Sequence, residues 1–380
     1  MARDFAAGEI RPHAPEWDAA RELDPGVFDK LAELGFMGMR VPEEYGGLGF
    51  DASTYLLALE ELAWGDAAVA LTVAIQNGPV TALLLAHGTD EQRERHLPAM
   101  AAGDVLTAFA LSEKDAGSDA GGLGCQAVRD GDGWVLTGEK RWVTNGARAG
   151  LVLVFARTDS SADRGHGIGA FIVDPSAEEY EVTGRETTMG LRASETVTVR
   201  LDGVRIDADA VVGDPEQGFR YALEALDVGR LGIGAQAVGI AQAAFEHSVA
   251  YALERQQFGR PIAEFGAIQG KLADMAARIS GARALVHAGA AAMDSGSCGS
   301  GADSRSARAA SAKLQASETA FWVADEAVQI FGGYGYMRDY PVEKLLRDAK
   351  GTEIYEGTSE ILRLVIAREI LNEAATSHEN

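Results

Sequence analysis

Residues 196–201 of the chain read Thr-Val-Thr-Val-Arg-Leu, and apolar and polar side chains alternate strictly along this stretch. Successive side chains of a β-strand point to opposite faces, so a period of two predicts a strand with one buried face. The segments Trp134–Thr137, Leu151–Phe155 and Phe171–Val173 are also β-forming, and a Gly131–Gly133 turn precedes the first of them. Several short strands separated by turns predict a barrel or sandwich rather than alternating strands and helices.

The sequence on both sides of this β-region is helical. Before it, Phe28, Leu31 and Leu34 follow helical spacing, and Gly88-Thr89-Asp90 is typical of one helix end followed by the cap of the next. After it, the chain is rich in alanine from Gly218 onward, with a loop expected around 294–306. This order predicts a multidomain α+β protein with a helical domain at residues 1–104, a β-barrel or sandwich at 105–212 and a helical domain at 213–380.

The charge balance restricts the partners of the protein. The 380-residue chain has 34 Lys and Arg against 57 Asp and Glu, a net charge of −23. Nucleic acids and anionic membrane surfaces attract basic proteins, so we expect neither as a partner. A polyanionic ligand would need a local cationic site within this acidic field. Cys125, Cys298 and the seven histidines have no metal-ligand spacing, so we expect no metal.

No apolar run in the sequence reaches the roughly 18–20 residues that span a bilayer. The longest candidates, Ala67–Ile75 and Leu151–Ala156, are shorter. The first residues mix charged and apolar side chains and lack the apolar region of a secretory signal. We therefore expect a cytoplasmic protein.

The strongest candidate for chemistry lies near the C-terminus, where residues 354–361 read Ile-Tyr-Glu-Gly-Thr-Ser-Glu-Ile. Thr358 is placed to cap the helix that follows, and Gly357 allows a ligand or the backbone to approach closely. Glu356 is therefore a carboxylate directly before a helix. The residues alone leave two interpretations, a functional carboxylate or a charge favoured by the helix dipole.

Two segments of the β-region carry candidate ligand-binding groups. Around Ser112, Gly117 and Ser118, hydroxyls and small residues form a loop that could present backbone N–H groups to a phosphate or a heterocycle. A plain surface loop is the alternative. Trp142 and Thr144 place an aromatic ring beside a hydroxyl, although a tryptophan on a strand is more often part of the core.

The C-terminal helical region contributes cations and glycines. Arg255 to Pro261 ends a helix with cations, which the helix dipole favours in any case. Gln329 to Gly335 is the clearest glycine cluster. Gly232, Gly234 and Gly239 are spaced like a dinucleotide-binding fingerprint, but no strand precedes them, so we interpret them as sites of close helix packing.

Taken together and in this order, these segments resemble the acyl-CoA dehydrogenase family, and the resemblance covers essentially the whole chain. It implies a helical N-terminal domain, a middle β-domain and a C-terminal four-helix bundle. It is carried by Val41–Gly49, Leu111–Asp119, Trp142–Asn145, Met189–Arg192, Arg255–Ile262, Gln329–Gly333 and Ile354–Ile361.

The resemblance implies FAD as cofactor, bound between the middle and C-terminal domains and shared between subunits of a homotetramer built as a dimer of dimers. On one subunit the flavin would be lined by Phe109, Leu111, Ser112, Gly117, Ser118, Trp142 and Thr144. The neighbouring subunit would contribute Arg255, Phe258, Ile262, Gln329, Ile330, Gly332 and Gly333, and Thr358 and Glu360 would lie near the diphosphate. Arginine is suited to a pyrophosphate because it makes charge-assisted hydrogen bonds.

The resemblance also implies the chemistry. Glu356 would remove the α-proton of an acyl-CoA thioester while the β-hydrogen passes to the flavin as hydride, with electrons going on to an electron-transferring flavoprotein. Burial should raise the pKa of such a base. The substrate would be contacted by Ser118, Asp227, Arg230, Tyr355 and Gly357. Some relatives carry the base at the position of Gly229, which here has no side chain, so Glu356 has no competitor.

Three positions differ from the family pattern, and other functions are compatible with the sequence. Lys114 stands where relatives usually have proline, and Gly266 and Gly270 replace residues near the adenine side. The alternatives are a dehydrogenase or oxidase acting on a carrier-bound acyl group, or a non-catalytic helical binding protein that kept the fold. A serine hydrolase lacks its nucleophile elbow. No local motif predicts the length of the acyl chain.

Overall fold

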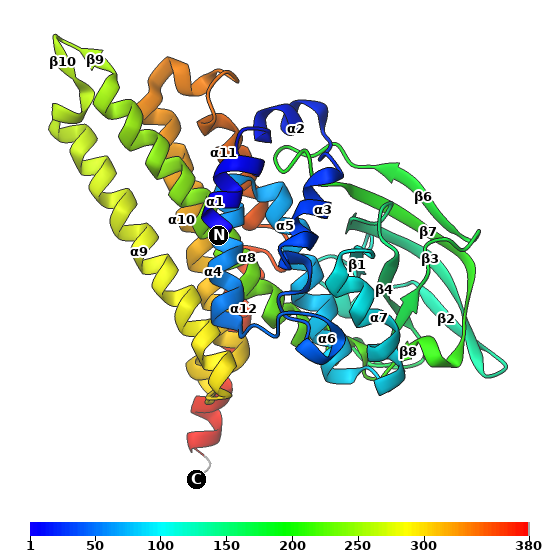
Figure 1. Cartoon of the computed structure of the whole chain (residues 1–380). Coiled ribbons are helices and arrows are strands. Elements are labelled where there is room, and N and C mark those ends of the chain that lie inside the picture. The colour runs from blue at the N-terminus through cyan, green and yellow to red at the C-terminus, as the bar shows by residue number, and fades with distance from the viewer. Residues whose placement is uncertain (379–380) are drawn as a thin grey trace.

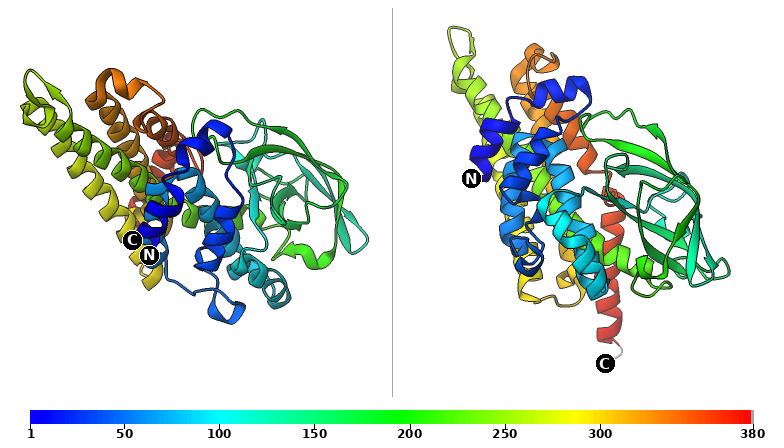
Figure 2. Two further views of the ribbon diagram at one scale, coloured as in Figure 1. Left: turned by 45° about the horizontal axis from the view of Figure 1, so that its top comes forward. Right: turned by 45° about the vertical axis from the view of Figure 1, so that its right-hand side comes forward.

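The computed structural model describes residues 1–378 and has three parts in the predicted order (Figure 1). The N-terminal helices lie between a C-terminal helical bundle and a curled sheet, an arrangement that the two further views also show (Figure 2). The predicted fold class is confirmed.

The N-terminal part is helical, and its helices begin where the sequence supplies caps. The Asp51 side chain accepts from Thr54 N and caps α4, and Asp66 accepts from Ala68 N and Val69 N at the start of α5. Thr89 forms a capping box with Gln92 at the start of α7. The elements are α1 (Ala2–Phe5), η1 (Ala6–Ile10), α2 (Ala14–Ala20), α3 (Gly26–Glu33), η2 (Phe36–Gly38), η3 (Glu43–Tyr45), α4 (Ala52–Gly65), α5 (Ala67–Ile75), η4 (Gln76–Val80), α6 (Thr81–His87) and α7 (Asp90–Ala102).

The α5–η4–α6 segment is the most apolar part of the chain. The expectation that no apolar run is long enough to span a bilayer was wrong for this segment, because the helical path continues past Ile75 and Ala67–His87 is long and apolar enough by length and composition. However, 89% of its most apolar stretch of 18 residues is buried inside the protein. It therefore serves as a core element. Gly78 breaks its helical geometry with ψ −108°, and Pro79 follows, so the segment bends at η4.

The middle part forms one mixed sheet, which among the described residues has eight strands in the order β6-β7-β3-β2-β4-β5-β8, with β1 pairing β4 in parallel. The Gly131–Gly133 turn joins β2 to β3 as predicted. The strands are β1 (Thr107–Ala110), β2 (Gln126–Asp130), β3 (Gly133–Thr144), β4 (Leu151–Arg157), β5 (Ile168–Val173), β6 (Tyr180–Arg185), β7 (Thr196–Ile206) and β8 (Val211–Val212), with η5 (Ala120–Gly122) and η6 (Ala208–Ala210) between strands.

This sheet is buried on both faces where it meets the helices. Along β4, Leu151, Leu153 and Phe155 belong to the core shared with the helices, whereas Val152 and Val154 belong to a second core enclosed by the curled sheet. The continuous apolar run of β4 is explained by these two environments, because a strand covered on both faces has no polar side.

The C-terminal part is a bundle around one long helix, α8 (Gly218–Glu254). Its glycines allow close packing as predicted: a Cβ on Gly239 would lie 2.3 Å from Glu60 O, and one on Gly234 would lie 3.0 Å from Val286 Cγ2. The remaining elements are β9 (Gln256–Gln257), β10 (Arg260–Pro261), η7 (Ile262–Glu264), α9 (Gly266–Ser295), η8 (Gly301–Asp303), α10 (Arg305–Phe331), η9 (Gly332–Tyr336), α11 (Val342–Thr352) and α12 (Ser359–His378).

A buried ion cluster joins all three parts. Lys344 on α11 donates to Asp66 and to Asp348, each at 2.7 Å, and both carboxylates are fully buried. Asp348 also accepts the backbone N–H of Leu191 from the middle part at 2.6 Å. Burial lowers the pKa of Lys344, but the two carboxylates raise it by more, so its pKa stays above the ordinary value. The cluster therefore holds its charge in place and fixes α11 against both other parts.

A neighbouring ion pair also links α11 to the other two parts of the chain. Arg347, also on α11, makes paired contacts with Asp18 of α2 at 2.9 and 3.0 Å, and Arg192 of the middle part approaches the same carboxylate at 3.3 Å. Two successive turns of α11 thus contact both other parts.

We expect Lys344→Met to lower the free energy of unfolding by about 3–5 kcal/mol, because it leaves two buried carboxylates without their cation. Urea unfolding followed by circular dichroism would measure this loss. Lys30→Met is the control, since Lys30 and its partner Glu9 are exposed and its removal should change the midpoint little. Equal midpoints for the two variants would contradict the role of the cluster.

Candidate active site

Glu356 lies in the short loop between α11 and α12, with a backbone conformation unusual for its type. Its φ is +54° and that of Gly357 is +101°. Ser359 N donates to Glu353 O at 3.0 Å, and Ile361 N donates to Thr358 Oγ1 at 3.3 Å, so the predicted cap is formed. A left-handed glutamate costs conformational energy and persists only where its surroundings enforce it.

The carboxylate of Glu356 occupies the space left open by Gly229. A Cβ added to Gly229 would lie 2.0 Å from Glu356 Oε2, so no side chain fits at that position with the carboxylate in place. Oε2 is buried and has no hydrogen-bond partner among the described residues. Because buried polar atoms are rarely left unpaired, an unpaired carboxylate oxygen marks a candidate functional group.

Its surroundings change its acidity. Burial raises the pKa of Glu356 to about 7, against the opposing effect of the charges on Lys313 and Arg230. A carboxyl whose pKa lies near neutrality can accept a proton with useful driving force. Burial with a specific charged partner is the combination typical of catalytic groups.

Asp227 and Arg230 lie beside this carboxylate on α8, but they first contact each other. Their side chains form a buried ion pair at 2.7 Å, and Ser306 donates to Asp227 at 2.6 Å. Arg230 Nε also approaches Glu356 O at 3.4 Å. The ion pair therefore supports the loop that carries Glu356, a contact that the sequence pattern did not reveal.

Tyr355 and Gln236 anchor the loop on its other side. The Tyr355 hydroxyl donates to Gln236 Oε1 at 2.7 Å, and Gln236 Nε2 donates to Ala67 O at 2.7 Å. Gln236 is fully buried in α8. Sequence reasoning missed it, although a polar side chain in an otherwise apolar helix stretch was a usable signal.

The Ser112–Ser118 segment follows β1 as predicted, next to the end of β3. Glu113 accepts from Gly124 N, Cys125 N and the buried Lys140, which fixes the start of the loop despite Lys114 at the usual proline position. Phe109 and Leu111 lie on and just after β1, with Leu111 buried.

Trp142 presents a flat aromatic surface beside this loop. It has φ +56° next to an irregularity in the β3–β7 pairing, is 53% exposed, and its ring carbon would lie 3.8 Å from a Cβ on Gly117. Thr144 is half-buried at the end of β3. An exposed indole beside a glycine offers an apolar face on which a planar ring system could stack.

The other predicted cofactor residues gather at the far end of α8. Arg255 lies 5.2 Å over the ring of Tyr334, next to the exposed glycines Gly332 and Gly333. Phe258, at the tip of the β9–β10 hairpin, is 94% exposed with φ +51°. Gln329 is exposed, whereas Ile330 and Ile262 are buried. Arg255 has no carboxylate partner among the described residues, which leaves it available to an anion.

The two sets of residues are far apart within one chain. A helix of 37 residues is about 55 Å long, and α8 runs from its contact with β5 at Gly218 to the hairpin at Arg255. Figure 1 shows the hairpin at the opposite end of the molecule from the sheet. The sheet that carries Trp142 and the hairpin that follows Arg255 therefore lie in different parts of the molecule (Figure 1).

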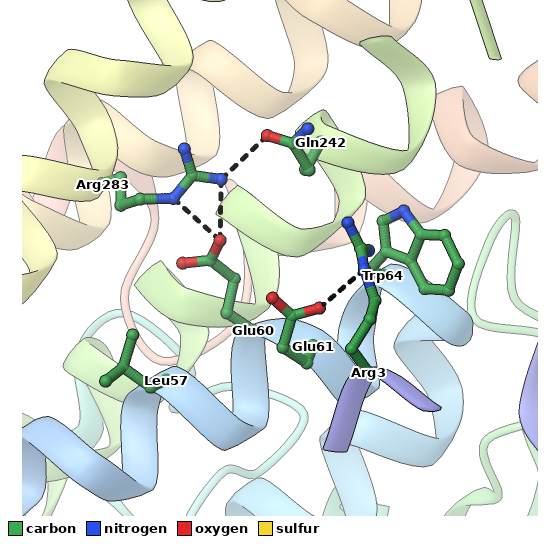
Figure 3. A pocket seen from close by; sticks show the side chains of 7 residues that line it. All are labelled: Arg3, Leu57, Glu60, Glu61, Trp64, Gln242 and Arg283. Atoms are coloured by element: carbon green, nitrogen blue, oxygen red, sulfur yellow. Dashed lines mark hydrogen bonds and ion pairs between the residues drawn. The ribbon is translucent and has the colours of Figure 1, made fainter. Parts of the chain in front are cut away.

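A separate polar pocket of about 190 Å³ lies between α1, α4, α8 and α9 (Figure 3). Arg283 pairs with Glu60 and Gln242 there, and Arg3 with Glu61. Gln242 follows Gly229 by thirteen residues on α8, about 20 Å along the helix, so this pocket is not part of the site around Glu356.

No cluster of three or more His, Cys, Asp or Glu side chains suited to a metal occurs in residues 1–378.

Comparison with known proteins identifies the family. Models of the acyl-CoA dehydrogenase N-terminal, middle and C-terminal domains match residues 1–104, 108–204 and 216–371. This chain belongs to the acyl-CoA dehydrogenase family. It is therefore an FAD-dependent oxidoreductase that dehydrogenates acyl-CoA, as the resemblance implied.

Three similar proteins illustrate the relationship. The probable acyl-CoA dehydrogenase YngJ of Bacillus subtilis is 46% identical over 98% of this chain and 96% of its own. The structure of butyryl-CoA dehydrogenase from Megasphaera elsdenii is 39% identical, with a TM-score of 0.93 over 97% of this chain and 96% of that one. A structure from work on the electron transferring flavoprotein of Acidaminococcus fermentans is 40% identical, with a TM-score of 0.93 over 98% and 96%.

We expect Gly229→Ala to displace the carboxylate of Glu356 and to slow acyl-CoA-driven flavin reduction about 100-fold, because small misplacements of a reacting group are costly. FAD content should persist, and the overpacking by one methyl group should cost at most about 1–3 kcal/mol of stability. The control is Gly281→Ala on α9, whose added Cβ meets nothing within 4 Å. Stopped-flow reduction would compare the two, and a normal rate for Gly229→Ala would contradict the geometry.

Proposed function

We propose that Glu356 is the base of this dehydrogenase and that a carboxylate oxygen of Glu356 takes the α-proton of the acyl thioester. The observation that carries this proposal is the buried, unpaired Oε2 of a carboxyl with a raised pKa, directly against Gly229. FAD, when bound, supplies the acceptor for the β-hydride. Removing the proton and the hydride leaves the 2-enoyl thioester.

The loop also offers a donor for the thioester. The backbone N–H of Glu356 has no acceptor among the described residues, and a preorganised donor of this kind stabilises the negative charge that develops on the carbonyl oxygen. We assign the substrate contacts to Ser118, Asp227, Arg230, Tyr355 and Gly357, as the family resemblance implied.

We assign FAD to a site shared by two chains within a homotetramer. One chain would offer the Trp142 face with the Ser112–Ser118 loop, and its neighbour Arg255, Phe258 and the Gln329–Gly333 turn. Support comes from the position of the hairpin at the opposite end of the molecule from the sheet (Figure 1), from the exposed ring of Phe258, and from Arg255, which has no carboxylate partner among the described residues. Thr358 and Glu360 would lie near the diphosphate.

An electron-transferring flavoprotein is the acceptor we propose, in the cytoplasm. The similar structure from work on such a flavoprotein supports this assignment. A carrier-bound acyl group remains the rival substrate, and butyryl-CoA dehydrogenase among the similar structures favours a CoA thioester.

We propose that the acyl chain is short, because of the side chains packed beyond Gly229. Beyond Gly229, a Cβ on Gly78 at the bend of η4 would lie 3.9 Å from Gly229 Cα and 3.8 Å from the Tyr55 hydroxyl. The same hydroxyl lies 3.3 Å from the Cβ position of Gly232, and Tyr55 is fully buried. In this proposal, the phenol would limit the room for an acyl chain that extends past Gly229. The similarity to a butyryl-CoA dehydrogenase agrees with this.

Glu356→Gln should keep bound FAD but slow anaerobic bleaching by butyryl-CoA at least about 100-fold, because the amide cannot accept the proton. In the wild-type protein, kcat/KM should rise with pH through about 7 as the carboxyl ionises. Stopped-flow absorbance and a pH profile would measure both. A normal bleaching rate in Glu356→Gln would place the base elsewhere.

Tyr55→Ala should raise the ratio of kcat/KM for octanoyl-CoA to that for butyryl-CoA by about tenfold or more, because the phenol no longer fills the end of the pocket. Tyr55→Phe keeps the ring and should retain the short-chain preference. If both variants kept the wild-type ratio, Tyr55 would not limit the chain length.

A further inference from the structure

Lys313 is a fully buried lysine on α10 with an unusual set of contacts. Its Nζ donates to Gly357 O at 2.8 Å, and no carboxylate lies within ion-pair distance among the described residues. Burying an ammonium group without a carboxylate is costly. Stability alone does not explain this side chain.

The contact fixes the loop directly after the base. Lys313 holds the carbonyl of Gly357, and Arg230 approaches the preceding carbonyl, that of Glu356. One turn further along α10, Ser317 donates to Thr352 O at 2.9 Å. Two successive peptide groups are thus held by cations, which accounts for the left-handed conformation of Glu356.

The position of the charge matters as much as the hydrogen bond. Lys313 is directed at the carbonyl of the next residue and not at the carboxylate, so Oε2 of Glu356 stays free to accept a proton. A direct ion pair would hold the carboxylate in its charged form and weaken it as a base. The charged and titratable groups that also face this region are Asp227 and Arg230 on α8, Tyr55 on α4, Glu353 and Tyr355 in the loop, and Glu360 on α12.

We propose that Lys313 is a positioning residue for catalysis, which holds the Glu356–Gly357 backbone and provides a positive charge that favours the carboxylate without pairing with it. This inference rests on the proposed role of Glu356 as the base. The Lys313 charge lowers the pKa of Glu356, so its removal should raise that pKa. Burial lowers the pKa of Lys313 itself to about 8.

The test compares three variants of the FAD-loaded protein with butyryl-CoA. Lys313→Met removes the charge and the donor, and should lower kcat while moving the acidic limb of kcat/KM to higher pH by about one unit. Lys313→Gln keeps a donor without the charge, so the limb should still move. Lys313→Arg keeps the charge, so the limb should stay near that of the wild type.

Lys271→Met, which removes the ion pair with Glu326 away from the loop, is the control and should leave the pH profile unchanged. If Lys313→Met does not fold, Lys313→Gln is compared with Lys313→Arg instead. If the acidic limbs of the kcat/KM profiles of these two variants coincide, the proposal is overturned. Wild-type profiles in the Lys313 variants, with Glu356→Gln inactive, would refute only the role of Lys313. An active Glu356→Gln would refute the base assignment itself.

Discussion

The buried cation of Lys344, held between Asp66 and Asp348, is the contact on which the arrangement of the molecule depends. It is where the three parts of the chain meet, because Asp66 begins a helix of the first part and Asp348 binds the backbone of the middle part at Leu191. The helix that carries Lys344 runs directly into the loop of Glu356. The ion cluster therefore helps to position Glu356, the base that we propose, without taking part in the proposed chemistry.

The pKa of Glu356 results from two opposing electrostatic effects, burial and nearby positive charge. Burial disfavours the charged carboxylate, and two cations on different helices favour it without forming an ion pair with it. Gly229 leaves the space that the carboxylate fills. A side chain with an ordinary acidity in water is thereby suited to accept a proton near neutral pH.

Much of the fold was predictable, because it depends on local patterns: the alternation in β7, the Gly131–Gly133 turn and the Thr89 cap each determine structure over a few residues. The Glu356 loop was also recognisable from its motif. Lys313, Gln236 and Tyr55 were not, because each acts through contacts between helices distant in sequence. A lone polar residue in an apolar helix face shows that it needs a partner but does not identify that partner.

The length of α8 has a genetic consequence. Because the sheet that carries Trp142 and the hairpin after Arg255 lie at opposite ends of the molecule (Figure 1), the shared flavin site we propose would draw its two halves from different copies. Two inactive chains, one damaged at each end, would then complement each other in a mixed oligomer, since some sites would receive both intact halves. A chain damaged only at the hairpin would likewise leave incomplete the flavin site of the normal chain with which it assembles.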